Sequence, residues 1–392
     1  MTFDLQKIRA ETPGINNRIH FNNAGASLMA SPIHHAVLKH LDLEMQIGGY
    51  EAQDTVFSAL EHTYDAIAAL INCSRDEVAL MENASAAWSS AFHGMALQKG
   101  DRILTAEAEY ASNVISYLQM AEKKGVKIDV IPSDTMGQTD VAALENMIDG
   151  KVKLISISHI PTNGGLINPA REIGAIARKH KIPYLLDACQ SVGQIPLDVE
   201  KIGCDMLSAT GRKYLRAPRG TGFLYVRKNF MEQLSPPFLD LHSADWTSKT
   251  TYKIRSDARR FENWERNIAA VIGLGVAVDY FMNIGVETAS KRLCALAAEA
   301  RTGLSNIRGF TVHDVGPRKG GIVTFTHDRV APAEIKNILH NHDINITTTP
   351  ITATRYDMEK RSLNILARAS FHYYNNEEEL AKFLNVLQDL QK

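Results

Sequence analysis

The sequence predicts an α/β protein in which a large, doubly wound and mostly parallel sheet domain is followed by a smaller α+β domain. Three observations lead to this fold class. In the middle of the chain, short β-branched runs alternate with helical patterns, which is typical of parallel strands joined by helices. In these runs apolar residues stand at successive positions, as expected for strands that helices cover on both faces. After about residue 255, one long apolar helix and a few mixed elements replace this alternation.

The expected strands of the large domain follow one another through the middle of the chain. They cover residues 102–107, 153–160, 182–188, 205–210 and 222–226, and the pattern leaves the direction of the last one open. A helix is expected over 169–180, because Pro169 suits a first helical turn, where its missing N–H is not needed. Ligands of open α/β sheets bind beyond the carboxyl ends of the strands, so residues just after these strands are candidates for a site.

The smaller domain is expected after a long helix over 267–283. Its predicted elements are a strand over 321–327, a helix over 331–342, a strand over 363–370 and a last helix that starts at acidic residues 376–379. Negative charge in a first turn complements the helix dipole. We therefore expect an N-terminal segment, 1–20, packing with the small domain, a large domain over 21–260, and a connecting helix with the small domain over 261–392.

Composition and charge exclude several classes of protein. The 392 residues carry 43 Lys and Arg against 44 Asp and Glu, so nothing in the net charge of −1 indicates a nucleic-acid or membrane partner. The four cysteines form no CxxC pair, which speaks against a disulfide framework or a thiolate zinc site. No signal-peptide pattern and no apolar run of about 20 residues is present. We expect a cytoplasmic enzyme that acts on a small molecule without a metal.

Three features at strand ends point to a common chemistry. Asp187 closes an apolar strand, Lys213 follows the next strand within a basic loop, and the turn MENASA precedes a helix whose first N–H groups would hold a phosphate. Each has an ordinary structural explanation: a buried polar residue, a solvated loop and a helix cap. Together they match what pyridoxal phosphate requires, since a lysine forms the Schiff base and an aspartate holds the pyridinium proton.

With these features, the chain resembles the class V aminotransferase family of fold-type-I pyridoxal phosphate enzymes. DACQSVGQIPLDV followed by SATGRKYLRAPRGTGFLYV resembles the family's signature stretch, and the resemblance extends from FNNAG, near residue 21, to ARASFHYYNNEEE, near residue 375. It implies pyridoxal 5′-phosphate as cofactor. It also implies a homodimer whose active sites lie at the subunit interface.

The resemblance assigns roles around the cofactor. Lys213 would be the Schiff-base lysine and proton shuttle, with a pKa depressed by neighbouring positive charge, and Asp187 would pair with the pyridine nitrogen. Gln190 would donate to the ring hydroxyl, and Tyr110 would stack on the ring where the family usually has histidine. The residues expected at the phosphate are Ala84, Ser85, Thr210 and Arg212. Many relatives have histidine directly before the lysine, so Arg212 is a departure that keeps a cationic donor.

The resemblance also assigns the substrate side. Arg368 matches the family arginine that clamps the substrate α-carboxylate, which a bidentate guanidinium suits. Asn22 and Asn23 are expected near the substrate, and one of His159 and Thr162 near the ring.

One stretch departs from the family pattern. FENWERN places Trp264 and Glu265 where some relatives have a Gly-Thr pair that reaches the partner's phosphate, so this contact is in doubt here.

The fold does not choose the reaction, because the family holds desulfurases, lyases, epimerases, kynureninases and aminotransferases. Desulfurases take sulfur on a loop cysteine before the carboxylate-binding arginine, and residues 347–370 contain none. SHIPTNGGLINP and FENWE resemble the branch with hercynylcysteine sulfoxide lyases and isopenicillin N epimerase-like proteins.

Our interpretation is a β-eliminating C–S lyase acting on a cysteine S-conjugate or its sulfoxide, with release of thiol or sulfenate, pyruvate and ammonia. Hercynylcysteine sulfoxide, in ergothioneine-type biosynthesis, is its most concrete substrate. Tyr110 and either Arg355 or Tyr356 are candidates to contact the substrate side chain. The alternatives are a cysteine desulfurase or selenocysteine lyase, and an amino-acid epimerase or aminotransferase.

Overall fold

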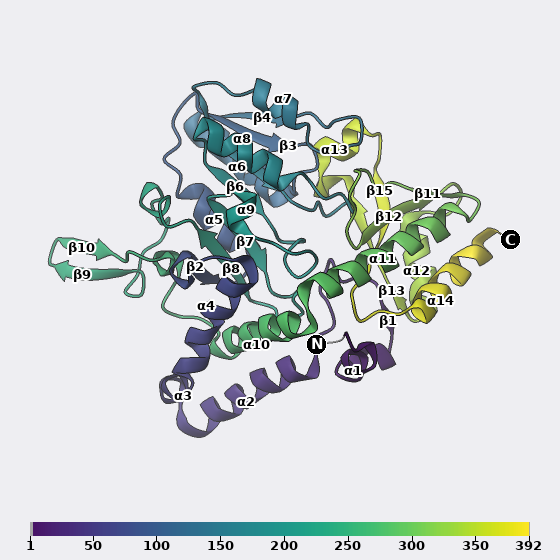
Figure 1. Cartoon of the computed structure of the whole chain (residues 1–392), viewed down its shortest axis with the longest axis horizontal. Helices are drawn as coiled ribbons and strands as arrows, with labels where there is room; N and C mark the ends of the chain where they lie inside the picture. Colours follow the sequence, from purple (N-terminus) through teal and green to yellow (C-terminus); the bar gives the residue numbers. More distant parts are fainter. Residues whose placement is uncertain (1–2, 392) are drawn as a thin grey trace.

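The computed structural model describes residues 3–391 and shows a large sheet domain beside a smaller one (Figure 1). The large sheet has seven strands in the order β2-β8-β7-β6-β5-β3-β4. The strands are β2 (Val78–Met81), β3 (Arg102–Ala106), β4 (Lys127–Ile131), β5 (Val152–Ser158), β6 (Tyr184–Asp187), β7 (Met206–Thr210) and β8 (Gly222–Val226). All neighbours pair in parallel except β8, which is antiparallel to both β2 and β7. The structure thus gives the direction of β8, which the sequence pattern left open.

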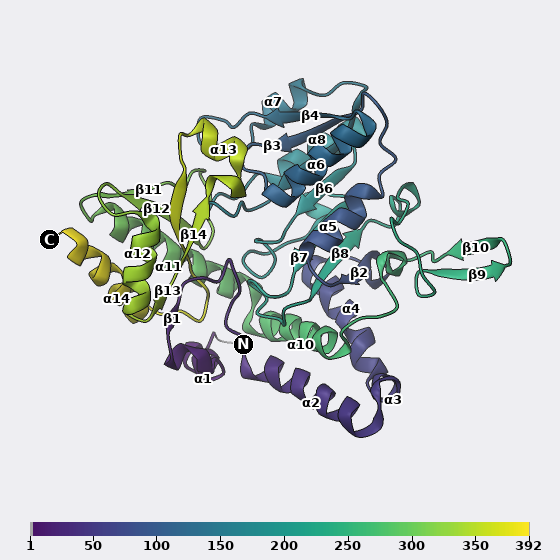
Figure 2. The same ribbon diagram turned by 180° about the vertical axis from the view of Figure 1, so that it is seen from behind.

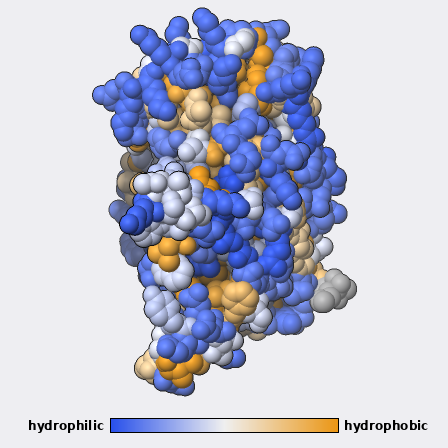
Figure 3. Space-filling model, turned by 90° about the vertical axis from the view of Figure 1, so that its left-hand side faces the viewer, coloured by the Kyte–Doolittle hydropathy of each residue, from blue (hydrophilic) through white to orange (hydrophobic). Residues whose placement is uncertain are grey.

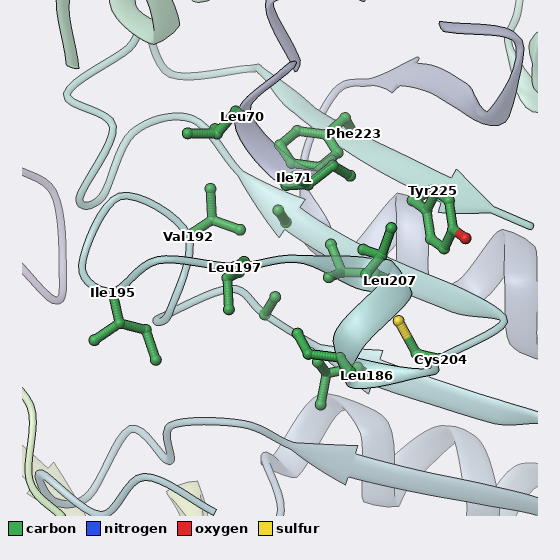
Figure 4. Close-up of a cluster of buried hydrophobic side chains, with 14 of the residues drawn as sticks. Leu70, Ile71, Leu186, Val192, Ile195, Leu197, Cys204, Leu207, Phe223 and Tyr225 are labelled. Carbon is green, nitrogen blue, oxygen red and sulfur yellow. The ribbon is translucent and has the colours of Figure 1, made fainter. Parts of the chain in front are cut away.

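Successive strand residues pack into two separate cores, one on each face of the sheet. Leu185 and Met206 belong to a cluster with the aromatic side chains of α5 (Ala84–His93) and α6 (Ala111–Lys124). Leu186 and Leu207 point to the opposite face, where they meet Ile71 and Phe223 (Figure 4). Side chains alternate across a strand, so only a strand covered on both faces is apolar at every position. This explains why apolar residues stand at successive positions in the strand sequences.

Helices from both ends of the large domain cover the second core. They are α4 (Phe57–Ile71), α7 (Val141–Asn146), α8 (Ala170–His180), α9 (Val199–Ile202) and α10 (Ile268–Ile284). The apolar helix α10 packs against α4 and α2 (Ser31–Ile47), and α3 (Gly49–Thr55) joins these two. At the turn between α2 and α3, Gly48 has a φ of 98°, which favours glycine.

The small domain begins with α11 (Val286–Ser305), which meets α10 at an angle of 81°. Its antiparallel sheet has the order β11-β12-β15-β14. The strands are β11 (Phe310–Val312), β12 (Ile322–His327), β14 (Thr347–Pro350) and β15 (Ile365–Ser370), and the helices are α12 (Pro332–Asn341), α13 (Arg355–Lys360) and α14 (Glu377–Gln388). Within residues 3–391 no single helix could cross a membrane; only the bent pair of α10 and α11 meets the length and composition criterion.

The N-terminal segment lies against the small domain. Its strand β1 (Ile19–His20) pairs in parallel with β13 (Ile344–Asn345). Arg9, in α1 (Leu5–Ala10), donates to Glu379 at 2.8 Å. Figure 2 shows this segment beside the domain from behind.

A β-hairpin extends away from the rest of the large domain (Figures 1 and 2). It consists of β9 (Ala244–Ser248) and β10 (Thr251–Ile254). Trp246 and Tyr252 on this hairpin are 81% and 62% exposed. Figure 3 looks onto the side of the molecule that carries it, where hydrophobic residues lie among hydrophilic ones. Two aromatic side chains in solvent on a projecting arm are unusual for a surface that contacts only water.

Candidate active site

The predicted lysine and aspartate lie close together at the carboxyl edge of the large sheet. Asp187 is the last residue of β6, and Lys213 follows the adjacent strand β7 by three residues. Both are buried, with 7% and 8% of their surface exposed. The Asp187 carboxylate accepts hydrogen bonds from the Cys189 backbone N–H and from Asn113 Nδ2, each at 2.9 Å. Lys213 Nζ donates to Cys189 Sγ at 3.3 Å.

Burial shifts the pKa values of both groups in the direction that favours their neutral forms. It lowers the pKa of Lys213; Cys189 opposes this shift and Arg212 adds to it. We expected neighbouring positive charge to depress the pKa of this lysine, but burial is the larger cause. Burial also raises the pKa of Asp187 against the hydrogen bonds from Asn113 and Cys189. A poorly solvated amine is the reactive form for attack on a carbonyl group, and the carboxylate is ready for a cationic partner.

The start of α5 forms a cradle for an anion. Asn83 caps this helix by accepting a hydrogen bond from the Ala86 N–H at 2.9 Å. The N–H groups of Ala84 and Ser85 in the first turn have no partner within the described chain, as is usual at a helix start. A Cβ on Gly222 would come within 2.8 Å of the backbone carbon of Asn83, so only glycine lets β8 approach the cradle this closely.

Thr210 and Arg212 follow β7 toward the same edge of the sheet. The Thr210 hydroxyl donates to the backbone oxygen of Thr221 at 3.3 Å, and Arg212 donates to the backbone oxygen of Gly25. Their predicted contact with a phosphate group stays a prediction.

Arg368 reaches across from the small domain. It lies in β15 and donates from Nη1 to the backbone oxygen of Thr162 at 3.1 Å and to its hydroxyl at 2.6 Å. Its Nε is buried without a partner. Burial lowers the pKa of Arg368 to about 10, so the guanidinium is charged at neutral pH, although no carboxylate of residues 3–391 forms an ion pair with it. A substrate carboxylate would supply that anion.

Tyr110 precedes α6 and leaves its ring 38% exposed, and its hydroxyl is close enough to Arg368 to influence the pKa of that side chain. Stacking of this ring on a cofactor stays a prediction. Arg355 and Tyr356, at the start of α13, lie nearer the surface: Arg355 pairs with Glu359.

The two predicted asparagines differ in their surroundings. Asn23 is fully buried: its Nδ2 donates to the backbone oxygens of His20 and Ser370, and its Oδ1 accepts from Tyr374. These bonds use the side chain for internal structure. Asn22 Oδ1 is buried without a partner, so of the two only Asn22 has an unused acceptor.

His159 and Thr162 also lie in different surroundings. Thr162 contacts Arg368, whereas His159 lines a cavity of about 800 Å³ together with Cys294 and Arg318. Neither Lys213 nor Arg368 borders that cavity. Burial, with Arg318 as a second cause, lowers the pKa of His159 to about 3, so this imidazole is neutral.

The FENWE stretch is anchored by Glu262. This buried carboxylate accepts hydrogen bonds from the Tyr64 hydroxyl and the Leu80 N–H, both at 2.8 Å, and pairs with Arg266 at 2.9 Å. Trp264 follows it onto the surface, 49% exposed, with its N–H donating to Asp240.

Sequence reasoning missed a second buried carboxylate behind Asp187. Glu109 is 1% exposed and follows β3 by three residues, as Asp187 ends β6. The available signal was a polar run, EAEYASN, directly after an apolar strand. Asn113, which bonds both carboxylates, belongs to the same run.

The unused polar atoms of the site fit pyridoxal phosphate. Gln190 Oε1, three residues after Asp187, is buried without a partner, and Asn22 Oδ1 and Arg368 Nε are further buried atoms without partners that a substrate could use. Such atoms cost free energy unless a ligand pairs with them. A group with a ring N–H, a ring hydroxyl and an aldehyde would pair with the aspartate, the glutamine and the lysine. When bound, it would act as an electron sink for the substrate's α-carbon.

Comparison with known proteins agrees with this assignment. Residues 19–383 match the sequence pattern of the family Aminotransferase class-V. A probable cysteine desulfurase of Pyrococcus abyssi is 29% identical over 99% of this chain and 98% of its own length. Another, from Borreliella burgdorferi, is 32% identical over 78% of this chain and 73% of its own length.

Solved structures agree as well. The apo cysteine desulfurase of Thermococcus onnurineus has a TM-score of 0.92 at 27% identity, covering 98% of this chain and 97% of its own. A cystine C–S lyase, C-DES, in complex with cysteine persulfide has a TM-score of 0.88 at 23% identity, covering 96% and 99%, and shows the likeness of the fold.

These findings confirm the fold class, the cofactor and the enzyme class, a pyridoxal phosphate-dependent lyase, that the sequence predicted. Family membership rests on a match that spans both domains and includes the buried lysine, the aspartate and the small-domain arginine. The chain belongs to the class V aminotransferase family of pyridoxal phosphate enzymes.

Proposed function

We propose that the enzyme cleaves the carbon–sulfur bond of cysteine or of an S-substituted cysteine. The single observation that carries this proposal is the buried set of Lys213, Asp187 and Arg368, in a chain whose full-length relatives are named cysteine desulfurases. A lysine and an aspartate alone would serve any reaction of the cofactor. The relatives direct the choice to sulfur chemistry.

In this proposal each residue has a distinct task. Arg368 binds the α-carboxylate with its guanidinium fork and so orients the amino acid. Lys213, with its lowered pKa, removes and returns the proton at the α-carbon. Asp187 would hold the proton on the cofactor ring nitrogen, and Tyr110 would cover the ring.

The relatives support cysteine itself over hercynylcysteine sulfoxide as the substrate. A desulfurase transfers sulfur from cysteine to a thiolate and leaves alanine, so an acceptor is needed. The printed name of the P. abyssi relative and of the others reported above favours this route. Our first interpretation, a lyase for an imidazole-bearing sulfoxide, has no such support.

One observation favours β-elimination as a second candidate. Residues 347–370 contain no cysteine that could take up sulfur. Cys189 is next to Lys213, but burial raises the pKa of its thiol, so it stays protonated and a poor nucleophile. Elimination needs no protein thiol: cysteine and water give pyruvate, ammonia and hydrogen sulfide.

Product analysis tests the proposal and separates the two routes. Purified enzyme with bound cofactor is incubated with L-cysteine, S-alkyl cysteines and a cysteine sulfoxide, with and without dithiothreitol as acceptor. Alanine that depends on dithiothreitol indicates a desulfurase using an external acceptor, whereas pyruvate and ammonia in equal amounts indicate elimination. Cys189→Ala is the control: if this thiol accepts sulfur, the variant lowers alanine relative to pyruvate, whereas an effect through its contact with Lys213 lowers both products alike. Racemisation or amino transfer to a 2-oxo acid, without sulfur release, would refute the proposal.

We also propose that two chains form a dimer through the β9–β10 hairpin. Trp246 and Tyr252 are exposed there, and aromatic residues are frequent hot spots of interfaces, each worth about 2 kcal/mol or more. The double variant Trp246→Ala, Tyr252→Ala is expected to weaken self-association at least about 100-fold. Light scattering across a dilution series measures it. The control is Met136→Ala, which removes an exposed side chain before α7. If the wild type is monomeric at every concentration, the proposal is wrong.

A further inference from the structure

Behind Asp187 lies a second carboxylate that no cation within residues 3–391 pairs with. Glu109 is 1% exposed, and five donors converge on its two oxygens. They are the hydroxyl of Thr105 (3.2 Å), the N–H of Tyr110 (2.9 Å), Nδ2 of Asn113 (2.8 Å), and the N–H (2.9 Å) and hydroxyl (2.5 Å) of Ser158. Five hydrogen bonds hold a carboxylate in one orientation and favour its charged form over the neutral one.

Asn113 connects the two carboxylates. From the first turn of α6 its Nδ2 donates at 2.8 Å to Glu109 Oε1 and at 2.9 Å to Asp187 Oδ2. The other Asp187 oxygen accepts the Cys189 N–H at 2.9 Å. Both N–H groups of the Asn113 amide are therefore used by carboxylates, so its orientation depends on Glu109. The direction in which Asp187 presents its oxygens depends on Asn113 in turn.

The charges around this pair are unbalanced. Burial, followed by the charge of Asp187, raises the pKa of Glu109 to about 7 against its five donors. The other titratable groups that face Glu109 are the phenols of Tyr117 and Tyr184, which are neutral. Lys213 acts on Asp187, yet burial lowers the pKa of this lysine as well. The two buried acids are therefore close enough to bind one cation together, and none of the described residues supplies it.

We propose that Glu109 is a positioning residue: through Asn113 it orients Asp187, and its negative charge helps to keep the ring nitrogen of the bound cofactor protonated. A protonated pyridine nitrogen is the cation that the two acids lack. Glu109 would then act on the cofactor at one remove, without touching it. The proposal does not depend on which substrate the enzyme uses.

A cofactor without a ring nitrogen makes the test specific. We would measure dissociation constants of pyridoxal 5′-phosphate and of its carbocyclic analogue, in which carbon replaces the ring nitrogen, by fluorescence titration of wild type and Glu109→Gln. The variant should bind pyridoxal phosphate about tenfold more weakly, the equivalent of one pKa unit at the ring nitrogen. Its affinity for the analogue should not change. A merely structural role would weaken both cofactors equally.

Two further variants guard against misfolding. Asn113→Ala keeps both carboxylates and removes only the connection, so it too should weaken pyridoxal phosphate more than the analogue. Thr105→Val is the matched control, because it removes one neutral donor from Glu109 at nearly constant volume; we expect it to treat both cofactors alike. Equal losses for the two cofactors in Glu109→Gln and Asn113→Ala, or no loss for either, would overturn the proposal.

The unloaded protein offers a second readout of the Glu109 charge. A group whose folded pKa lies above its unfolded value stabilises the fold below the unfolded pKa and loses this effect as pH rises through the folded pKa. For Glu109 this window runs from 4.5 to about 7. Melting temperatures of unloaded wild type should therefore fall across it more than those of Glu109→Gln. Parallel curves would contradict ionisation of Glu109 and with it the proposed charge effect.

Discussion

Replacement of Lys213 by alanine is expected to lower turnover of every amino-acid substrate by at least about 10⁴-fold, since it removes both the nucleophile and the general base of the proposed reaction. Lys213 is the buried amine at the strand edge, in contact with Cys189, and burial lowers its pKa. The variant should also lose covalent attachment of the cofactor. Mass spectrometry after borohydride reduction measures this directly, and the yellow colour of the protein should fade.

The fold of this variant should survive. Lys213 is buried with a lowered pKa, so its removal takes away a desolvated group and should not reduce the melting temperature of the unloaded protein. Lys201→Ala, at an exposed lysine of α9, provides the control for loss of a positive charge. If borohydride still attached the cofactor to the Lys213→Ala protein, another lysine would hold the group.

Replacement of Arg368 by alanine should have the second largest effect, a loss in kcat/KM of about 10²–10³-fold for amino-acid substrates. Its guanidinium is buried and charged, with Nε unpaired and Nη1 on Thr162, so it is shaped to receive a carboxylate. Loss of this contact should raise KM, because binding weakens, and lower kcat, because the α-carbon is no longer held in place. Steady-state kinetics with cysteine separate the two parameters.

Arg368→Lys refines this prediction. A lysine keeps the charge and loses the planar fork, so it should restore part of KM and less of kcat. Arg329→Ala is the matched control, since this exposed arginine of the small domain pairs with the neighbouring Asp328 and has no proposed contact with substrate. Cofactor affinity should be nearly unchanged in Arg368→Ala. Unchanged kcat and KM would place the carboxylate clamp at another residue.

The central strands were predictable because their neighbours on both faces are helices. Apolar side chains at successive positions, such as Leu185 and Leu186, serve two different cores, and this leaves a continuous run in the sequence. For the same reason, the direction of a strand could not be predicted from its apolar pattern. Strand β8 would be apolar on both faces whether it ran parallel or antiparallel to β7. The β9–β10 hairpin escaped prediction because it has no buried face, and so no alternation of apolar and polar residues.

The site was predictable where one rule sufficed. Asp187 and Lys213 both follow strands, and adjacent parallel strands end at one edge of the sheet. The contact of Glu109 with Ser158 could not be predicted in this way, because it depends on β3 lying next to β5. The order of strands in a sheet does not follow from the local sequence pattern. Nor could the sequence distinguish Asn22 from Asn23. The two residues differ in the hydrogen-bond partners of their side-chain amides, and these partners are known only from the folded structure.

The hydrogen bonds between Arg368 and Thr162 have a mechanical consequence. They join β15 of the small domain to the loop after β5 of the large domain. In the proposed function, a substrate with its α-carbon at Lys213 and its carboxylate on Arg368 would span the same gap and would hold the two domains together. By linkage, saturation with such a ligand at 100 times its Kd adds about 2.7 kcal/mol to the stability of the assembled pair of domains. Release of the amino acid would then weaken the contact between the two domains before the next turnover.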